Sequence, residues 1–297
     1  MYSQVAANKR KTVLLIAIFL LIVGGLGWVI SRAEGTPSLF IAVGSFALVY
    51  GLISYYGSAK IALALSGARP VSKKEAPELY RVVENLTITA GLPMPSVNVI
   101  NDPAPNAFAT GRDPQHAAVA ATTGLLELLD KQELEGVIAH ELSHVGNYDI
   151  RLMGVVLVLV TIVAFVSDFF LRMTFWGFGD DEDSGGNAIF LVVGIAAAIL
   201  APIIATLLQL AVSRKREFLA DASGVLLTRY PEGLAAALKK IAGSNQDMRH
   251  ANASTAHLFI ANPFRGKRGR SFVANLFSTH PPIEQRIQRL MQMEGQP

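Results

Sequence analysis

The sequence contains no cysteine among its 297 residues. This absence excludes disulfide bonds, thiolate metal sites and a cysteine nucleophile, so any bound metal must be held by histidine and carboxylate side chains. Charge is also scarce, because 16% of the residues are charged, whereas an average soluble domain has about 25%. Together with a hydrophobic fraction of 51%, this argues against a freely soluble enzyme and against a disordered chain. The net charge of +3 is too small to indicate a nucleic-acid partner.

Four long apolar runs account for this composition. They cover residues 12–30, 38–57, 152–171 and 188–212. A helix needs roughly 20 apolar residues to cross the hydrocarbon core of a bilayer, and each run has about that length. The runs therefore predict four transmembrane helices. Two alternatives are less favoured: buried helices of a large soluble core, and a cleaved signal peptide for the first run.

Basic residues flank these runs unevenly. Four spans place both chain ends on one side of the membrane, and eleven Lys and Arg residues flank the spans on that side, against only Arg32 and Arg172 on the other. By the positive-inside rule we expect both ends in the cytoplasm and the acidic loop 172–187 outside. The eleven residues are Lys9, Arg10, Lys11, Lys60, Arg69, Lys73, Lys74, Arg151, Arg214, Lys215 and Arg216.

The predicted spans divide the chain into two membrane hairpins, 12–57 and 152–212, and two cytoplasmic segments, 58–151 and 213–297. The two cytoplasmic segments are long enough to form one core if they pack together. Their residue patterns predict mainly helices with a small sheet. Expected strands lie near 97–100, 107–110 and 117–122, and expected helices cover 72–91, the stretch after Asp130, 216–230, 234–241 and 282–293.

Residues 140–144 read His-Glu-Leu-Ser-His. On a helix, His140 and His144 lie on one face, so both imidazoles can reach the same ion, and Glu141 lies beside them to act on a water. A catalytic zinc site usually has three protein ligands and an open fourth position, so this motif requires a third ligand.

The third ligand must be another histidine or a carboxylate. Glu217 is the best carboxylate, because it lies on a predicted helix with Asp221 four residues later on the same face. Asp221 would then accept the second N–H of a ligand histidine and fix its tautomer. Alternatively, both acids pair with the basic residues at 214–216. The histidine candidates are His116, His250, His257 and His280.

Four motifs in this order, together with the paired N-terminal spans, resemble the HtpX-type integral membrane zinc metalloproteases. Their wider peptidase family includes the CAAX prenyl endopeptidases. The motifs are Asn-Ala-Phe-Ala-Thr-Gly at 106–111, the motif at 140–144, Arg-Glu-Phe-Leu-Ala-Asp at 216–221 and Ser-Thr-His-Pro-Pro at 278–282. The resemblance implies a mainly α membrane protein with four transmembrane helices and a cytoplasmic, zincin-like α+β metalloprotease domain with a small sheet.

The resemblance also implies roles for individual residues. His140, His144 and Glu217 correspond to the ligands of one Zn²⁺ per chain, and Glu141 corresponds to the general base and acid. Asp221 falls on the acidic position that follows the third ligand.

Two further residues lie in motifs of the family. Asn106 lies beside an edge strand at the cleft, where it would hold the substrate backbone by β-augmentation. His280 would approach the metal and steady the oxyanion. On the residues alone, His280 is equally well explained as a turn residue before two prolines, and Asn106 is better explained as a turn residue after Pro105.

The spans also predict where the metal lies. His144 comes eight residues before the third run and Glu217 five residues after the fourth, so the metal should lie close to the cytoplasmic surface of a bacterial or archaeal cell membrane. We expect an endopeptidase that cleaves misfolded or damaged membrane proteins, or other unfolded polypeptides, in quality control. A membrane-bound zinc scaffold or chaperone without hydrolysis, and a prenyl-protein endopeptidase, remain the alternatives. The sequence leaves the oligomeric state open.

Overall fold

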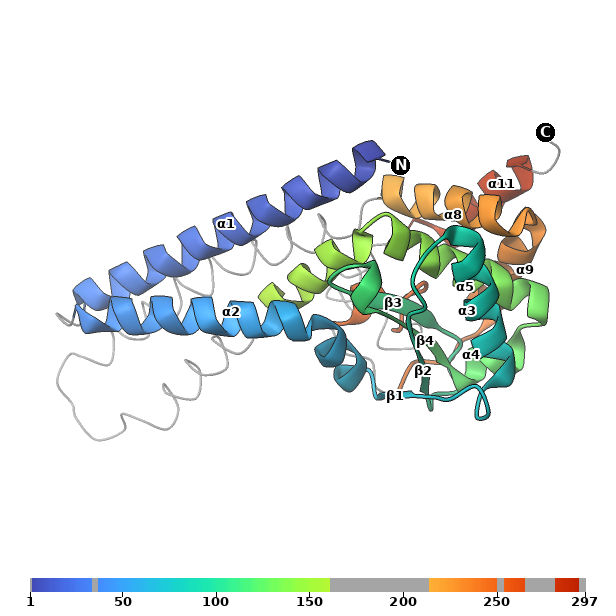
Figure 1. The fold of residues 1–297 in the computed structure, drawn as a ribbon, viewed down its shortest axis with the longest axis horizontal. Coiled ribbons are helices and arrows are strands. Elements are labelled where there is room, and N and C mark those ends of the chain that lie inside the picture. Colours follow the sequence, from blue (N-terminus) through green and yellow to red (C-terminus); the bar gives the residue numbers. More distant parts are fainter. Residues whose placement is uncertain (1, 34–36, 161–213, 250–253, 265–280, 294–297) are drawn as a thin grey trace.

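In the computed structural model, the described residues are 2–33, 37–160, 214–249, 254–264 and 281–293. They form a long helical hairpin joined to a lobe in which helices pack around a small sheet (Figure 1). The hairpin consists of α1 (Tyr2–Ala33) and α2 (Ser38–Leu65), which pack against each other. The prediction of a mainly helical chain with a small sheet is confirmed.

The first two predicted spans lie within α1 and α2. Across the described ranges, no single helix combines the length and hydropathy expected of a membrane span; Gly44–Ile53 and Tyr55–Leu65, which meet at a bend of 67°, reach that standard only together. Residues 149–160 are helical and contain the start of the third run. The rest of the third run, the fourth run and the loop 172–187 lie outside the described residues. The four spans therefore stay a prediction.

The sheet has four strands in the order β1-β2-β4-β3. The three expected strands are confirmed as β2 (Ser96–Ile100), β3 (Ala107–Gly111) and β4 (Ala117–Thr122). β2 and β4 are parallel, and β3 pairs antiparallel with β4 at one edge. β1 (Ala68–Pro70) was not expected, because three residues ending in proline carry no strand pattern; it pairs antiparallel with β2.

Helix α3 (Pro77–Ala90) begins later than the sequence predicted. Ser72 and Glu75 do interact, and the Ser72 backbone N–H donates to Glu75 Oε2 at 2.8 Å. This pair closes a turn before the helix, whereas Pro77 occupies the first helical turn, where its missing N–H costs nothing. The predicted C-terminal end is confirmed, because Gly91 caps the helix with φ of 63°.

Helix α5 (Lys131–Gly146) lies at the centre of the lobe. Its N-terminus carries the predicted capping box: Asp130 Oδ1 accepts from the Glu133 N–H at 3.0 Å, and Glu133 Oε2 accepts from the Asp130 N–H at 2.9 Å. Packed around α5 are the sheet and the helices α3, α8 (Arg214–Thr228) and α9 (Pro231–Gly243), while α11 (Ile283–Met293) packs on α8 and α9. The short helix α4 (Thr123–Leu128) follows β4. The two segments that were predicted to be cytoplasmic thus share one core.

Gly136 allows α5 and α9 to approach closely. A Cβ at this position would lie 2.7 Å from the backbone nitrogen of Leu234, so Gly136→Ala must push the helices apart. We expect a loss of roughly 1–3 kcal/mol in unfolding free energy, measured by denaturant unfolding in detergent. Gly243→Ala, at the end of α9 with open space around it, is the matched control and should be neutral or slightly stabilising. Equal stability of the two variants would contradict this account of the packing.

Candidate metal centre

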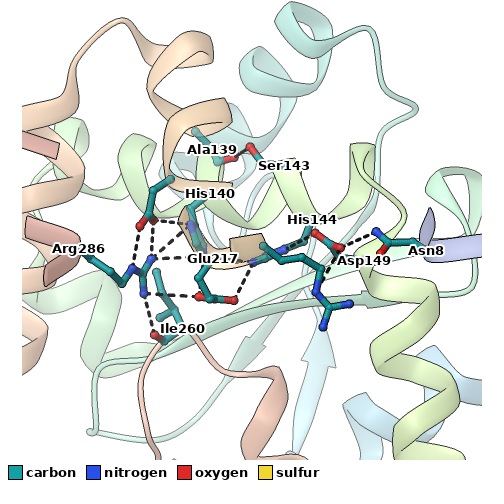
Figure 2. Close-up of polar contacts among 11 residues, drawn as sticks. Asn8, Ala139, His140, Ser143, His144, Asp149, Glu217, Ile260 and Arg286 are labelled. Carbon is teal, nitrogen blue, oxygen red and sulfur yellow. Dashed lines mark hydrogen bonds and ion pairs between the residues drawn. The ribbon is translucent and has the colours of Figure 1, made fainter. Parts of the chain in front are cut away.

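The site forms where α8 packs on α5. Gly224 of α8 lies so close to α5 that a Cβ there would be 3.0 Å from the backbone nitrogen of His140. This contact brings Glu217 of α8 next to the two histidines of α5 (Figure 2) and Asp221 next to His140. The structure therefore brings together residues that are more than seventy positions apart in the sequence.

The three predicted ligands converge on one point. The Nε2 atoms of His140 and His144 are 3.2 Å apart, and the Glu217 carboxylate oxygens lie 3.8 Å and 3.6 Å from them, respectively. All three residues are buried, and among the described residues they form a group whose ligand atoms lie within 4.8 Å of one another. Two ligands bound tetrahedrally at about 2.0–2.1 Å from an ion stand about 3.4 Å apart, so this spacing fits a metal ion.

Each histidine is held from behind by a carboxylate. His140 Nδ1 lies 2.9 Å from Asp221 Oδ1, and His144 Nδ1 lies 3.0 Å from Asp149 Oδ2. In each pair the ring N–H at Nδ1 donates to the acid, which leaves the lone pair of Nε2 facing the ligand group. Asp221 thus occupies the position that the sequence predicted for it. Asp149 was missed, although its place five residues after His144 was the available signal.

A buried arginine completes the back of the site. Arg286 of α11 is fully buried, and its Nε and Nη2 donate to the two oxygens of Asp221 at 2.9 and 2.7 Å. Burial alone would raise the pKa of Asp221, but the charge of Arg286 and the contacts with His140 together outweigh it and lower the pKa to about 2. Sequence reasoning missed Arg286. The signal was its position four residues before Leu290, on the face of α11 that turns inward.

The buried charges also fit a divalent cation. Four buried carboxylates surround the site, together with two buried guanidinium groups. Their formal charges leave an excess of two negative charges, which one divalent ion would neutralise. The carboxylates belong to Glu141, Asp149, Glu217 and Asp221, and the guanidinium groups to Arg216 and Arg286.

The surroundings shift the pKa values of the two histidines in opposite directions. Burial and the nearby Arg286 lower the pKa of His140 to about 4. Burial also acts to lower the pKa of His144, but the hydrogen bond that His144 donates to Asp149, together with the charges of Glu217 and Asp149, outweighs it and raises the pKa to about 9. Burial raises the pKa of Glu141 to about 7, with Glu217 adding to this effect, although the backbone N–H of Ala109 on β3 donates to this carboxylate. A cation at the ligands would favour the ionised form of Glu141.

The remaining predicted residues have different surroundings. Asn106 is buried, and its side chain pairs with the backbone of Ala261: Nδ2 donates to the carbonyl at 2.8 Å and Oδ1 accepts from the N–H at 3.2 Å. The Ile260 N–H donates to the Ala107 carbonyl beside it. A segment of the chain itself thus pairs with this end of β3, and contact between Asn106 and a substrate stays a prediction.

Two of the four alternative histidine ligands lie within the described residues, and neither joins the group. His116 lies on the surface with its Nδ1 2.6 Å from Asp113 Oδ1, and His257 is buried with its Nε2 3.3 Å from the Met153 carbonyl oxygen. His250 and His280 lie outside the described residues. The role predicted for His280 therefore has no structural account.

Comparison with known proteins agrees with this geometry. The family model of peptidase family M48 matches residues 73–294. The chain therefore belongs to peptidase family M48. That match covers every predicted ligand, Glu141 and both carboxylates behind the histidines.

Individual relatives narrow the class. The chain is 50% identical over 296 residues to a protease HtpX homologue of Tropheryma whipplei (strain Twist), covering 100% of this chain and 99% of the relative. It is 48% identical over 305 residues to a protease HtpX homologue of Lactobacillus acidophilus, covering 99% of this chain and 100% of the relative. The chain is accordingly a membrane metalloprotease of the HtpX type.

The fold is also similar to a solved structure. The crystal structure of S. mikatae Ste24p matches with a TM-score of 0.50 and 21% identity, over 93% of this chain. The match spans 61% of the Ste24p chain, so the likeness concerns the fold alone.

The buried ion pair predicts a large stability effect. Asp221→Asn keeps the shape of the side chain but leaves Arg286 buried without its closest carboxylate. We expect a loss of about 3–5 kcal/mol in unfolding free energy, measured by denaturant unfolding. Glu84→Gln breaks the exposed pair with Lys73, whose atoms are 2.7 Å apart, and should cost less than about 1 kcal/mol. Similar losses in both variants would show that burial does not govern this pair.

Proposed function

We propose that the chain is a zinc endopeptidase in which His140, His144 and Glu217 hold one Zn²⁺. The proposal rests on one observation, the convergence of their three ligand atoms within 4.8 Å of one another in a buried site. Two imidazoles and one carboxylate are a ligand set typical of catalytic zinc. When bound, zinc supplies a Lewis acid that lowers the pKa of a coordinated water toward about 7.

Glu141 is the proposed proton carrier. It follows the first ligand directly on α5, and its raised pKa of about 7 lies in the range where a carboxylate both accepts and gives up a proton. Its carboxylate takes the proton of the water that attacks the scissile carbonyl. It then delivers that proton to the nitrogen of the leaving amine. A zinc scaffold without hydrolysis would not require a buried acid beside the ligands, so Glu141 favours the endopeptidase over this alternative.

A tetrahedral oxyanion needs a second hydrogen-bond donor besides the metal. We propose His280 for this role and Asn106 as the next candidate. For Asn106, the supporting observation is its position at the start of β3, the strand whose Ala109 N–H donates to Glu141. Donation by Asn106 to a substrate requires its amide to leave Ala261.

The proposed substrates are misfolded or damaged membrane proteins, cleaved on the cytoplasmic side close to the bilayer. Four spans with both ends in the cytoplasm would place the metal beneath the membrane surface. This proposal is supported by the uneven distribution of basic residues. It is also supported by the four runs of about 20 residues with almost no charge, the length that a bilayer requires.

Glu141→Gln separates metal binding from hydrolysis. We expect the purified full-length variant to retain one zinc per chain and to lose peptide cleavage by about 10²–10⁴-fold, because the proton carrier is gone. Glu135→Gln, also on α5, is the matched control. Glu135 forms an ion pair with Lys131 at 3.7 Å, away from the ligand group, so this variant should cleave normally. Elemental analysis and casein cleavage, with chelator and zinc add-back, measure both properties. Normal cleavage by Glu141→Gln would remove this residue from the mechanism.

Membrane placement predicts a preference for anchored substrates. One cleavable sequence is fused either to a single membrane span, on its cytoplasmic side, or to a soluble carrier. In proteoliposomes that contain the full chain, we expect the anchored form to be cleaved about 10-fold faster, because confinement to one bilayer raises its effective concentration. Equal rates for the two forms would count against a membrane-protein substrate class.

A further inference from the structure

The N-terminal helix reaches the back of the metal centre. Asn8, in the second turn of α1, is buried with 2% of its surface exposed. Its Nδ2 donates to Asp149 Oδ1 at 2.7 Å and to the Asn147 carbonyl at 3.0 Å. Both N–H groups of this amide are therefore used by the turn that follows α5, about 140 positions later in the sequence. Figure 2 shows Asn8 and His144 on opposite sides of Asp149.

The carboxylate that Asn8 contacts is the one that holds a proposed metal ligand. Asp149 is completely buried; its Oδ1 accepts from Asn8, while its Oδ2 lies 3.0 Å from His144 Nδ1. Arg216 of α8 also approaches Oδ1, with its Nε 3.8 Å away. The hydrogen bond from Asn8 of α1 is shorter than this distance. It fixes the rotation of the carboxylate, and the carboxylate fixes the plane of the imidazole.

A second contact joins α1 to the same turn. Lys9 Nζ lies 4.8 Å from the ring centre of Tyr148, and Arg151 Cζ lies 5.0 Å from that ring. Tyr148 has a positive φ of 60°, which is uncommon for a residue other than glycine. Two neighbouring residues of α1 therefore contact the turn that connects His144 to Asp149, at a point where its backbone is strained.

We propose that Asn8 is a positioning residue for the metal centre, acting through Asp149 on His144. The first helix is then part of the metal site as well as a membrane anchor. The inference rests on the proposed function, because it takes His144 to be a metal ligand. Loss of a carboxylate behind a ligand histidine typically weakens metal binding 10–100-fold. Asn8 is one hydrogen bond further from the metal than Asp149, and it acts on His144 through Asp149.

The test uses the full-length chain in detergent, with zinc affinity measured by chelator competition and site geometry by the visible spectrum of the cobalt(II)-substituted protein. Asn8→Asp has the same shape but turns a carboxylate toward Asp149. We expect about 10-fold weaker zinc binding and an altered cobalt spectrum. Asn8→Ala, which removes the donor without adding a charge, should shift both readouts in the same direction and decides the matter if Asn8→Asp does not fold.

Two comparisons make the test specific. Thr12→Val removes another buried hydrogen bond of α1, from Thr12 Oγ1 to the Asn8 carbonyl at 2.9 Å, and should leave both readouts unchanged. In the double variant Asn8→Asp with Asp149→Asn, the amide at position 149 still accepts from His144 and now donates to position 8. Asp149→Asn alone loses the carboxylate behind His144 and should weaken zinc binding, so the coupling predicts that the double variant loses less affinity than the two single variants added together.

Unchanged zinc affinity and an unchanged cobalt spectrum in Asn8→Asp would overturn the inference, as would strictly additive effects in the double variant. These outcomes are separable from the fate of the proposed function. A chain that shows the coupling but cuts no peptide would refute the endopeptidase alone. A chain that cuts peptides normally with Asn8→Asp, and binds zinc as tightly, would refute only the coupling.

Discussion

The contact between α5 and α8 is the constraint on which the site depends. The two helices approach so closely at Gly224 that a single methyl group would meet the backbone of His140. Only at that separation do the carboxylates of α8 face the imidazoles of α5. The burial that follows sets the electrostatics, because charges removed from water must be balanced locally. Four acids and two arginines leave an excess of two negative charges, which one divalent ion would neutralise.

The close-range parts of this arrangement could be predicted from the sequence. The spacing of His140 and His144 needs only the geometry of one helix, the capping box at Asp130 needs only three residues, and β2, β3 and β4 carry their own residue patterns. Glu217 could be ranked first among the carboxylates, but its approach to the histidines depends on packing between two helices. The late start of α3 has a local cause. Ser72 and Glu75 predicted a helix start near residue 72, but the helix begins at Pro77.

The residues that sequence reasoning missed share one property. Asp149, Arg286 and Asn8 act through partners that the chain brings close only after folding: His144 across a turn, Asp221 at a separation of 65 positions and Asp149 at 141. A charged or amide side chain on a helix is usually read as a solvent-facing residue. Only the tertiary structure shows which of these charged or amide side chains are buried and paired instead. The strand β1 was missed because it has no residue pattern of its own; it is a strand only through its pairing with β2.

The pairing of Asp221 with Arg286 also fixes an order of assembly. During synthesis α5 and α8 emerge before α11, so the Asp221 carboxylate becomes available 65 residues before the guanidinium group that accompanies it in the folded chain. Until α11 has been synthesised, Arg286 is absent from the interior next to His140. Packing α8 on α5 at that stage would bury the Asp221 carboxylate without the guanidinium group that neutralises it. The buried surroundings of His140 are therefore complete only after α11 has been synthesised.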